Sequence, residues 1–200
     1  MMDEGALCAR EAACHLLLMQ KPARLPVRVE RLSLGKNLIV DSFERYCTLT
    51  GDTLERLLAG SGAALRDGCT LIRQRGENKV YIILYNEGVR SLRRRNFTLA
   101  HEMGHIFLGH EDDSPAFERQ ADAFAAELLA PRILVAEYLK SLRADQNPVS
   151  ALAQAFNISR SMAGLRVSGL SPAKFTEQER ALLFRYEAAL PSLSEPEIAY

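Results

Sequence analysis

Residues 96–110 read NFTLAHEMGHIFLGH, and most of them belong to a helical pattern over residues 91–108. A second helical pattern follows over residues 114–129, with Ser114 as its N-cap and a proline at the first helical position. Because the connection between the two patterns is short, we expect these helices to pack antiparallel. The rest of the fold is expected to assemble around this pair.

The first of these helices carries the pattern H-E-x-x-H, formed by His101, Glu102 and His105. Residues four apart in a helix lie one above the other, at about 6 Å, so both imidazoles can reach one zinc ion. Glu102 is rotated by roughly 100° around the helix and lies beside the metal without binding it. That position suits a general base that takes a proton from zinc-activated water. The motif alone also occurs by chance, so the other ligands matter.

A zinc peptidase site needs a third protein ligand and an open fourth position. Glu118, in the first turns of the second helix, is the best candidate, because the antiparallel return brings that helix back over the histidine face. Asp122 follows one turn later on the same face. Its carboxylate can accept the spare N–H of a ligating imidazole and fix the tautomer of that ring. Glu118 and Asp122 reproduce the E-x-x-x-D pattern of thermolysin-like enzymes.

Other ligand sets fit the sequence less well. Metzincins place their third ligand six residues after the second histidine, but that position is Glu111 here, and the required glycine position holds Leu108. His110 lies five residues after His105, off the metal face of an unbroken helix, and is expected to be a loop or structural histidine. His15 is expected to pack within the first helix, without a role in the site.

The remaining patterns predict an α+β fold. Residues 6–20 have apolar residues at helical spacing, and NLIVDSF (37–43) resembles a strand. CTLIRQR (69–75) and KVYIILY (79–85) flank a short Gly-Glu-Asn connection, which indicates a hairpin and a small antiparallel sheet. KVYIILY suits a core strand and equally an edge strand that pairs with an extended substrate. A helix, a small sheet and then helices give an α+β protein, with the zinc helix packed on the second ligand-bearing helix.

A break at Asn147-Pro148 suggests two regions: a zinc peptidase domain over residues 1–146 and a small helical segment over residues 147–200. We expect the second region to pack on the first or to recruit substrate. Within it, PVSALAQAFNISRSMAGLRV (148–167) is similar to a helix-turn-helix. Direct DNA binding is not expected, because the second helix of this motif offers few groups for bases and phosphates, namely Arg160, Ser161 and Arg166.

Composition excludes several other classes. Lys and Arg together number 25, as do Asp and Glu, so the net charge is zero and argues against a dedicated nucleic-acid binder. No apolar run approaches the length of a membrane span, and the N-terminal residues show no signal-peptide pattern. The four cysteines form no C-x-x-C pair. We therefore expect a cytoplasmic protein with reduced thiols and no membrane contact.

Two segments, RRRNFTLAHEMGHIFLGH and ERQADAFAAELLAP, resemble the ImmA/IrrE family of metallopeptidases, and the resemblance covers roughly residues 5–168. It implies a compact zinc peptidase that cleaves a helix-turn-helix repressor of the Xre type, and so derepresses mobile-element or stress genes. Carried over by position, it makes His101, His105 and Glu118 the ligands and Glu102 the base. Mn²⁺ or another divalent ion could replace zinc in such a site.

The resemblance also leaves an alternative open. Some members of the family show little peptidase activity and are paired with antitoxin-like regulators. The alternative is therefore a regulatory protein that sequesters a repressor or binds DNA without cutting its partner. Candidates for substrate contact are Arg94, seven residues before His101 on the same helix face, and Tyr85 and Asn86, which end the strand before the arginine-rich turn.

Overall fold

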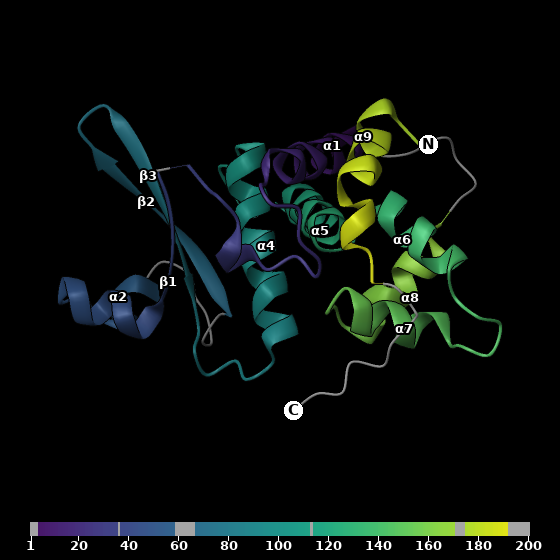
Figure 1. The fold of residues 1–200 in the computed structure, drawn as a ribbon. Coiled ribbons are helices and arrows are strands. Elements are labelled where there is room, and N and C mark those ends of the chain that lie inside the picture. Colours follow the sequence, from purple (N-terminus) through teal and green to yellow (C-terminus); the bar gives the residue numbers. More distant parts are fainter. Residues whose placement is uncertain (1–3, 36, 59–66, 113, 171–174, 192–200) are drawn as a thin grey trace.

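A computed structural model describes residues 4–35, 37–58, 67–112, 114–170 and 175–191 of the 200-residue chain. The elements in chain order are α1 (Glu4–Met19), the 3₁₀ turn η1 (Val29–Arg31), β1 (Leu38–Ser42), α2 (Phe43–Thr50), α3 (Leu54–Leu58), β2 (Gly68–Arg75), β3 (Asn78–Tyr85), α4 (Leu92–Leu108), α5 (Pro115–Leu129), α6 (Arg132–Lys140), α7 (Pro148–Ala155), α8 (Arg160–Ser168), α9 (Glu177–Tyr186) and the 3₁₀ turn η2 (Glu187–Ala189). The expected α+β class is confirmed, and α4 stands between the sheet and the other large helices (Figure 1).

The helix pair α4 and α5 forms as the sequence predicts. The Ser91 side chain accepts a hydrogen bond from the backbone of Arg94 and starts α4, while Gly109 ends it in the left-handed conformation at φ 67°. Ser114 caps α5 in the same way. His101 contacts α5 near its middle and His110 contacts it near its start, so the two helices run antiparallel.

Close packing of this pair depends on Gly104 of α4. A Cβ atom at this position would lie 3.0 Å from the Cα of Ala121 and 3.2 Å from its carbonyl oxygen. Gly104 is buried, and it lies between the two histidines of the H-E-x-x-H pattern. The missing side chain therefore lets α5 approach the part of α4 that carries the candidate ligands.

The sheet has the strand order β1-β3-β2. The predicted hairpin is confirmed, with β2 antiparallel to β3. The expected antiparallel sheet is nevertheless a mixed one, since β1 pairs in parallel with β3. The chain passes through α2, α3 and β2 between these two strands, and such a crossover permits parallel pairing. β3, the KVYIILY strand, is central, so its interpretation as an edge strand is wrong.

The main hydrophobic core lies on the side of α4 away from the sheet. α1 covers α5, and one cluster of buried side chains joins α1, α4 and α5 with α6, α7, α8 and α9 (Figure 1). A smaller cluster of Phe43, Ile82 and Leu84 lies under α2. The larger cluster contains residues from both sides of the expected boundary at 146/147, and the division into two regions stays a prediction.

Several local predictions were less accurate. The segment 27–35, whose sequence suits a short helix ended by Gly35, forms only the turn η1. The strand-like run at 37–43 ends in a helix, α2, that begins at Phe43. His15 is exposed instead of packed. DTLERLLAG (52–60) has a helical pattern, and α3 forms within it, while residues 59 and 60 lie outside the described residues. None of the described helices is long and apolar enough to span a membrane.

Candidate metal centre

Three ligand-type side chains converge where α4 meets α5. The Nε2 atoms of His101 and His105 are 3.0 Å apart. Glu118 places one carboxylate oxygen 3.3 Å from Nε2 of His101 and the other 3.5 Å from Nε2 of His105. For tetrahedral zinc with bonds near 2.05 Å, ligand atoms are expected about 3.3 Å apart. The donor set of two imidazole nitrogens and one carboxylate therefore fits a zinc ion and leaves a fourth position for substrate.

Asp122 orients the first of these imidazoles. Its Oδ1 atom lies 2.9 Å from Nδ1 of His101, so a proton on Nδ1 leaves the lone pair of Nε2 directed at Glu118 and His105. Burial lowers the pKa of His101, but the hydrogen bond and charge of Asp122, with the charges of Glu102 and Glu118, outweigh it and raise the pKa above its usual value. The surroundings of this imidazole thus favour positive charge, as a cation site requires.

The second imidazole has its own support, which the sequence pattern did not reveal. Nδ1 of His105 lies 3.1 Å from Nδ1 of His110, and Nε2 of His110 lies 3.1 Å from Oε1 of Gln120. If Gln120 accepts from His110, then His110 accepts in turn from Nδ1 of His105 and leaves Nε2 of that ring for a metal. The ring of Phe117 stacks on His110 at a centroid distance of 4.3 Å and fixes its plane.

Glu102 faces the sheet instead of α5. The hydroxyl of Thr70, in β2, donates a hydrogen bond of 2.7 Å to Oε2 of Glu102. β2 approaches α4 closely because it begins at Gly68, where a Cβ atom would lie 2.7 Å from Cγ2 of Thr98 and 2.9 Å from the carbonyl oxygen of Leu84. The candidate base is thus held beside the histidines by a strand far away in the sequence.

A cavity of about 640 Å³ opens over these groups. α4 contributes His101, Glu102 and His105 to its wall, α5 contributes Glu118, and residues of β2 line the opposite side. Within the described part of the chain, β2 pairs with β3 alone, so its other side is an outer edge of the sheet next to the cavity. An extended peptide could pair with that edge above the candidate ligands.

The structure separates the other three predicted contact residues from this cavity. Asn86 is buried, and its side chain accepts a hydrogen bond of 2.8 Å from the backbone of Gly88, which closes a turn. Tyr85 lies under the guanidinium of Arg95, 5.0 Å from the ring centroid. Arg94 forms an ion pair with Asp67 and lines a neighbouring groove. Asn86 and Tyr85 do not contribute to the cavity wall.

Comparison with known families singles out the same region. A family model described as Peptidase_M78, IrrE N-terminal-like domain, matches residues 66–168, which extend from the start of β2 to the end of α8. The match therefore contains every residue of the cavity wall except Leu57, both helices of the candidate metal centre and the α7–α8 pair. No curated protein matches the chain.

Proposed function

The chain belongs to the Peptidase_M78 family of IrrE N-terminal-like metallopeptidases, which covers more than half of its length, and we propose that it is a zinc-dependent endopeptidase. Its proposed substrate is a helix-turn-helix repressor of the Xre type in the cytoplasm, whose loss would derepress mobile-element or stress genes. One observation carries the proposal: His101, His105 and Glu118 offer ligand atoms within 4.8 Å of one another, beside a carboxylate on the next face of α4.

The proposed ligands are His101, His105 and Glu118, with Asp122 and His110 as residues that orient the two imidazoles. A bound zinc ion would polarise the scissile carbonyl and lower the pKa of the attacking water. Mn²⁺ would supply similar chemistry, and metal analysis of the purified protein would identify the ion.

Glu102 is the proposed general base. It would take a proton from the attacking water at a carboxylate oxygen and then give that proton to the leaving amine. The hydrogen bond from Thr70 restricts rotation of the carboxylate and supports this role, because proton transfer requires a fixed approach. The position of β2 at the outer edge of the described sheet supports action on a polypeptide, since an extended substrate could form backbone hydrogen bonds along such an edge.

The decisive experiment compares the wild type with Glu102→Gln, and uses Glu77→Gln, in the exposed β2–β3 turn, as a matched control. Each protein is loaded with zinc, its metal content is measured, and it is incubated with an Xre-type repressor from the same organism. Cleavage is followed by mass spectrometry. We expect all three proteins to bind zinc, and only Glu102→Gln to lose cleavage. Turnover by zinc-loaded Glu102→Gln would refute the role of Glu102.

The same experiment separates cleavage from sequestration. If the zinc-loaded wild type forms a stable complex with the repressor and leaves it intact, the protein acts by holding its partner, and the proposed peptidase activity is wrong. DNA binding would appear as an affinity for duplex DNA that falls steeply with salt concentration.

A further inference from the structure

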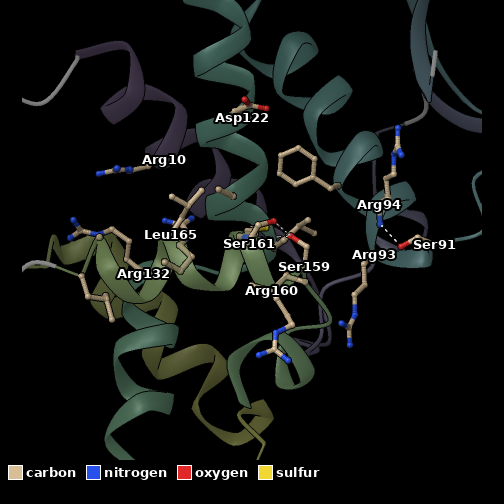
Figure 2. A pocket seen from close by; sticks show the side chains of 18 residues that line it. Arg10, Ser91, Arg93, Arg94, Asp122, Arg132, Ser159, Arg160, Ser161 and Leu165 are labelled. Atoms are coloured by element: carbon tan, nitrogen blue, oxygen red, sulfur yellow. Dashed lines mark hydrogen bonds between the residues drawn. The ribbon is translucent and has the colours of Figure 1, made fainter. Parts of the chain in front are cut away.

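A second and larger hollow, of about 810 Å³, lies beside the metal centre (Figure 2). We name it the arginine groove. Its walls come from the first half of α4, the second half of α5 and the whole of α8, with Arg10 of α1 and Arg132 of α6 at one end. Figure 2 shows Arg93 and Arg94 on one side, Arg10 and Arg132 on the other, and Leu165 between them.

The groove carries an excess of positive charge. Six of the side chains that line it are arginines, and Asp122 is the only carboxylate among them. Arg132 and Arg166 have partners beneath the surface: Glu179 at 3.0 Å and the fully buried Glu127 at 3.0 Å. Those two arginines are therefore neutralised from below, and Arg94 is neutralised by Asp67.

Arg93 and Arg160 also line the groove. Arg93 hydrogen-bonds only to the side-chain oxygen of Asn157, and Arg160 is exposed; neither forms an ion pair with a residue that the structure describes. Arg93 and Arg160 therefore leave positive charge in the groove that no described carboxylate pairs with.

The groove is apolar between these charges. Phe97, Leu129 and Met162 contribute to its walls, and Leu165 of α8, which also lines it, is 74% exposed. Exposed apolar surface in a concave site is typical of binding sites, and this one has basic groups at its rim. An occupant that complements it has apolar side chains flanked by carboxylates.

The arginine groove also adjoins the metal centre. Asp122, in its wall, lies 2.9 Å from His101, and Phe97 is one helical turn before that histidine, with 6.4 Å between the two ring centroids. The Arg94–Asp67 ion pair joins its α4 wall to the start of β2, which lines the metal cavity. A polypeptide in the groove would thus continue towards the candidate ligands.

We propose that the arginine groove docks an acidic, apolar segment of the substrate protein, outside the segment that is cut. This inference rests on the proposed peptidase function, because it assigns the groove to the same substrate. Small-molecule sites enclose roughly 70–90% of their ligand. The groove is open to solvent along three helices, which suits a peptide segment better than a small acid.

Duplex DNA is the competing occupant, since α7 and α8 are arranged around Asn157 as a helix-turn-helix would be. A recognition helix must project its first residues into a major groove about 12 Å wide. Arg160 and Ser161 instead line a hollow whose other wall is α4 and α5. The apolar surface around Leu165 gains nothing from a phosphate backbone. A peptide therefore fits these residues better than DNA does.

Binding is tested with zinc-loaded Glu102→Gln protein, so that cleavage cannot consume the probe. The probe is a short fluorescein-labelled peptide with leucines at helical spacing and glutamates between them, and its twin carries lysines in place of the glutamates. Fluorescence anisotropy gives the Kd. We expect the glutamate peptide to bind at least tenfold more tightly than its twin, and less tightly at high salt.

Two exposed residues of α8 are then changed, each with a matched control outside the groove. Leu165→Ser is paired with Leu49→Ser, and Arg160→Glu with Arg180→Glu. The groove variants should weaken binding of the glutamate peptide about tenfold, because the peptide would bury Leu165 and would pair with Arg160. Their circular dichroism spectra should be unchanged. The control variants should bind as the parent does.

Equal affinity for the two peptides, or unchanged binding by both groove variants, would overturn the proposal. Displacement of the peptide by laurate, a small apolar acid, would also overturn the proposal. Tight binding of duplex DNA without binding of the peptide would do the same. Failure of the proposed peptidase function would give another set of results. The peptide probe would bind and the groove variants would weaken that binding, but the zinc-loaded wild type would leave the repressor intact. If both proposals hold, Leu165→Ser raises KM for the repressor and leaves kcat unchanged.

Discussion

Replacement of Gly104 by alanine tests whether close helix contact builds the metal centre. In a free helix this change is favourable by about 1 kcal/mol. Here the new methyl group would lie 3.0 Å from the Cα of Ala121 and 3.2 Å from Cβ of Phe124. The atoms of Ala121 are backbone and cannot rotate away, so α5 must move by a few tenths of an ångström. Overpacking of this kind costs about 1–3 kcal/mol.

Gly164 provides the matched control, because it lies within α8 and a Cβ atom there would have no neighbour within 4 Å. Both substitutions replace glycine by alanine within a helix, so both gain the same free energy from helix propensity. The difference between their free energies of unfolding therefore reports the contact at Gly104 alone, and we expect about 1–3 kcal/mol. Gly164→Ala should be more stable than the wild type by up to about 1 kcal/mol, or roughly 2–4 °C in Tm.

Urea unfolding of the metal-free proteins measures the effect on stability, and zinc titration of the folded proteins measures the effect on zinc affinity. Glu118 and Asp122 lie one turn before and one residue after Ala121, so displacement of α5 moves both carboxylates away from the histidines. Gly104→Ala should therefore weaken zinc binding as well as stability, while Gly164→Ala leaves zinc binding unchanged. The reasoning fails if Gly104→Ala is as stable as Gly164→Ala and binds zinc like the wild type.

Four further changes address single contacts. Glu118→Ala should nearly abolish zinc binding in a calorimetric titration, because only two protein ligands remain. Asp122→Ala should lower zinc affinity by about 10–100-fold, as loss of a carboxylate behind a ligating histidine does. His110→Ala should lower zinc affinity by at least about tenfold, through release of the His105 ring. Glu127→Ala should reduce the free energy of unfolding in urea by about 3–5 kcal/mol, since it leaves the buried Arg166 without its partner.

The sequence predicted those features that local signals determine. Ser114 is the N-cap of α5 as predicted, and the helical pattern over 91–108 forms α4, because each depends on a few neighbouring residues. The geometry of the candidate ligands also follows from local rules, since their spacing within each helix places them on one face. Only the pairing of Glu118 with the histidines required the short loop as well.

The features that sequence reasoning missed depend on contacts between distant segments. The central position of β3 follows from its parallel pairing with β1, which lies before α2, α3 and β2 in the chain. Thr70 is an ordinary strand residue until the sheet packs on α4 and its hydroxyl reaches Glu102. Gln120 and Phe117 have no motif of their own. Their role beside His110 appears only when α5 returns antiparallel to α4.

The same helix pair fixes the distance between the metal centre and the arginine groove. Arg94 and His101 lie seven residues apart on one face of α4, which is about 10 Å along the axis. A segment docked in the groove would therefore hold the following residues near the candidate ligands at a high effective concentration. Discrimination between substrates would then come from the docked segment and not from the residues beside the cut bond. A short peptide without an acidic segment would be a poor substrate even with every zinc ligand in place, and its KM, not its kcat, would show the difference.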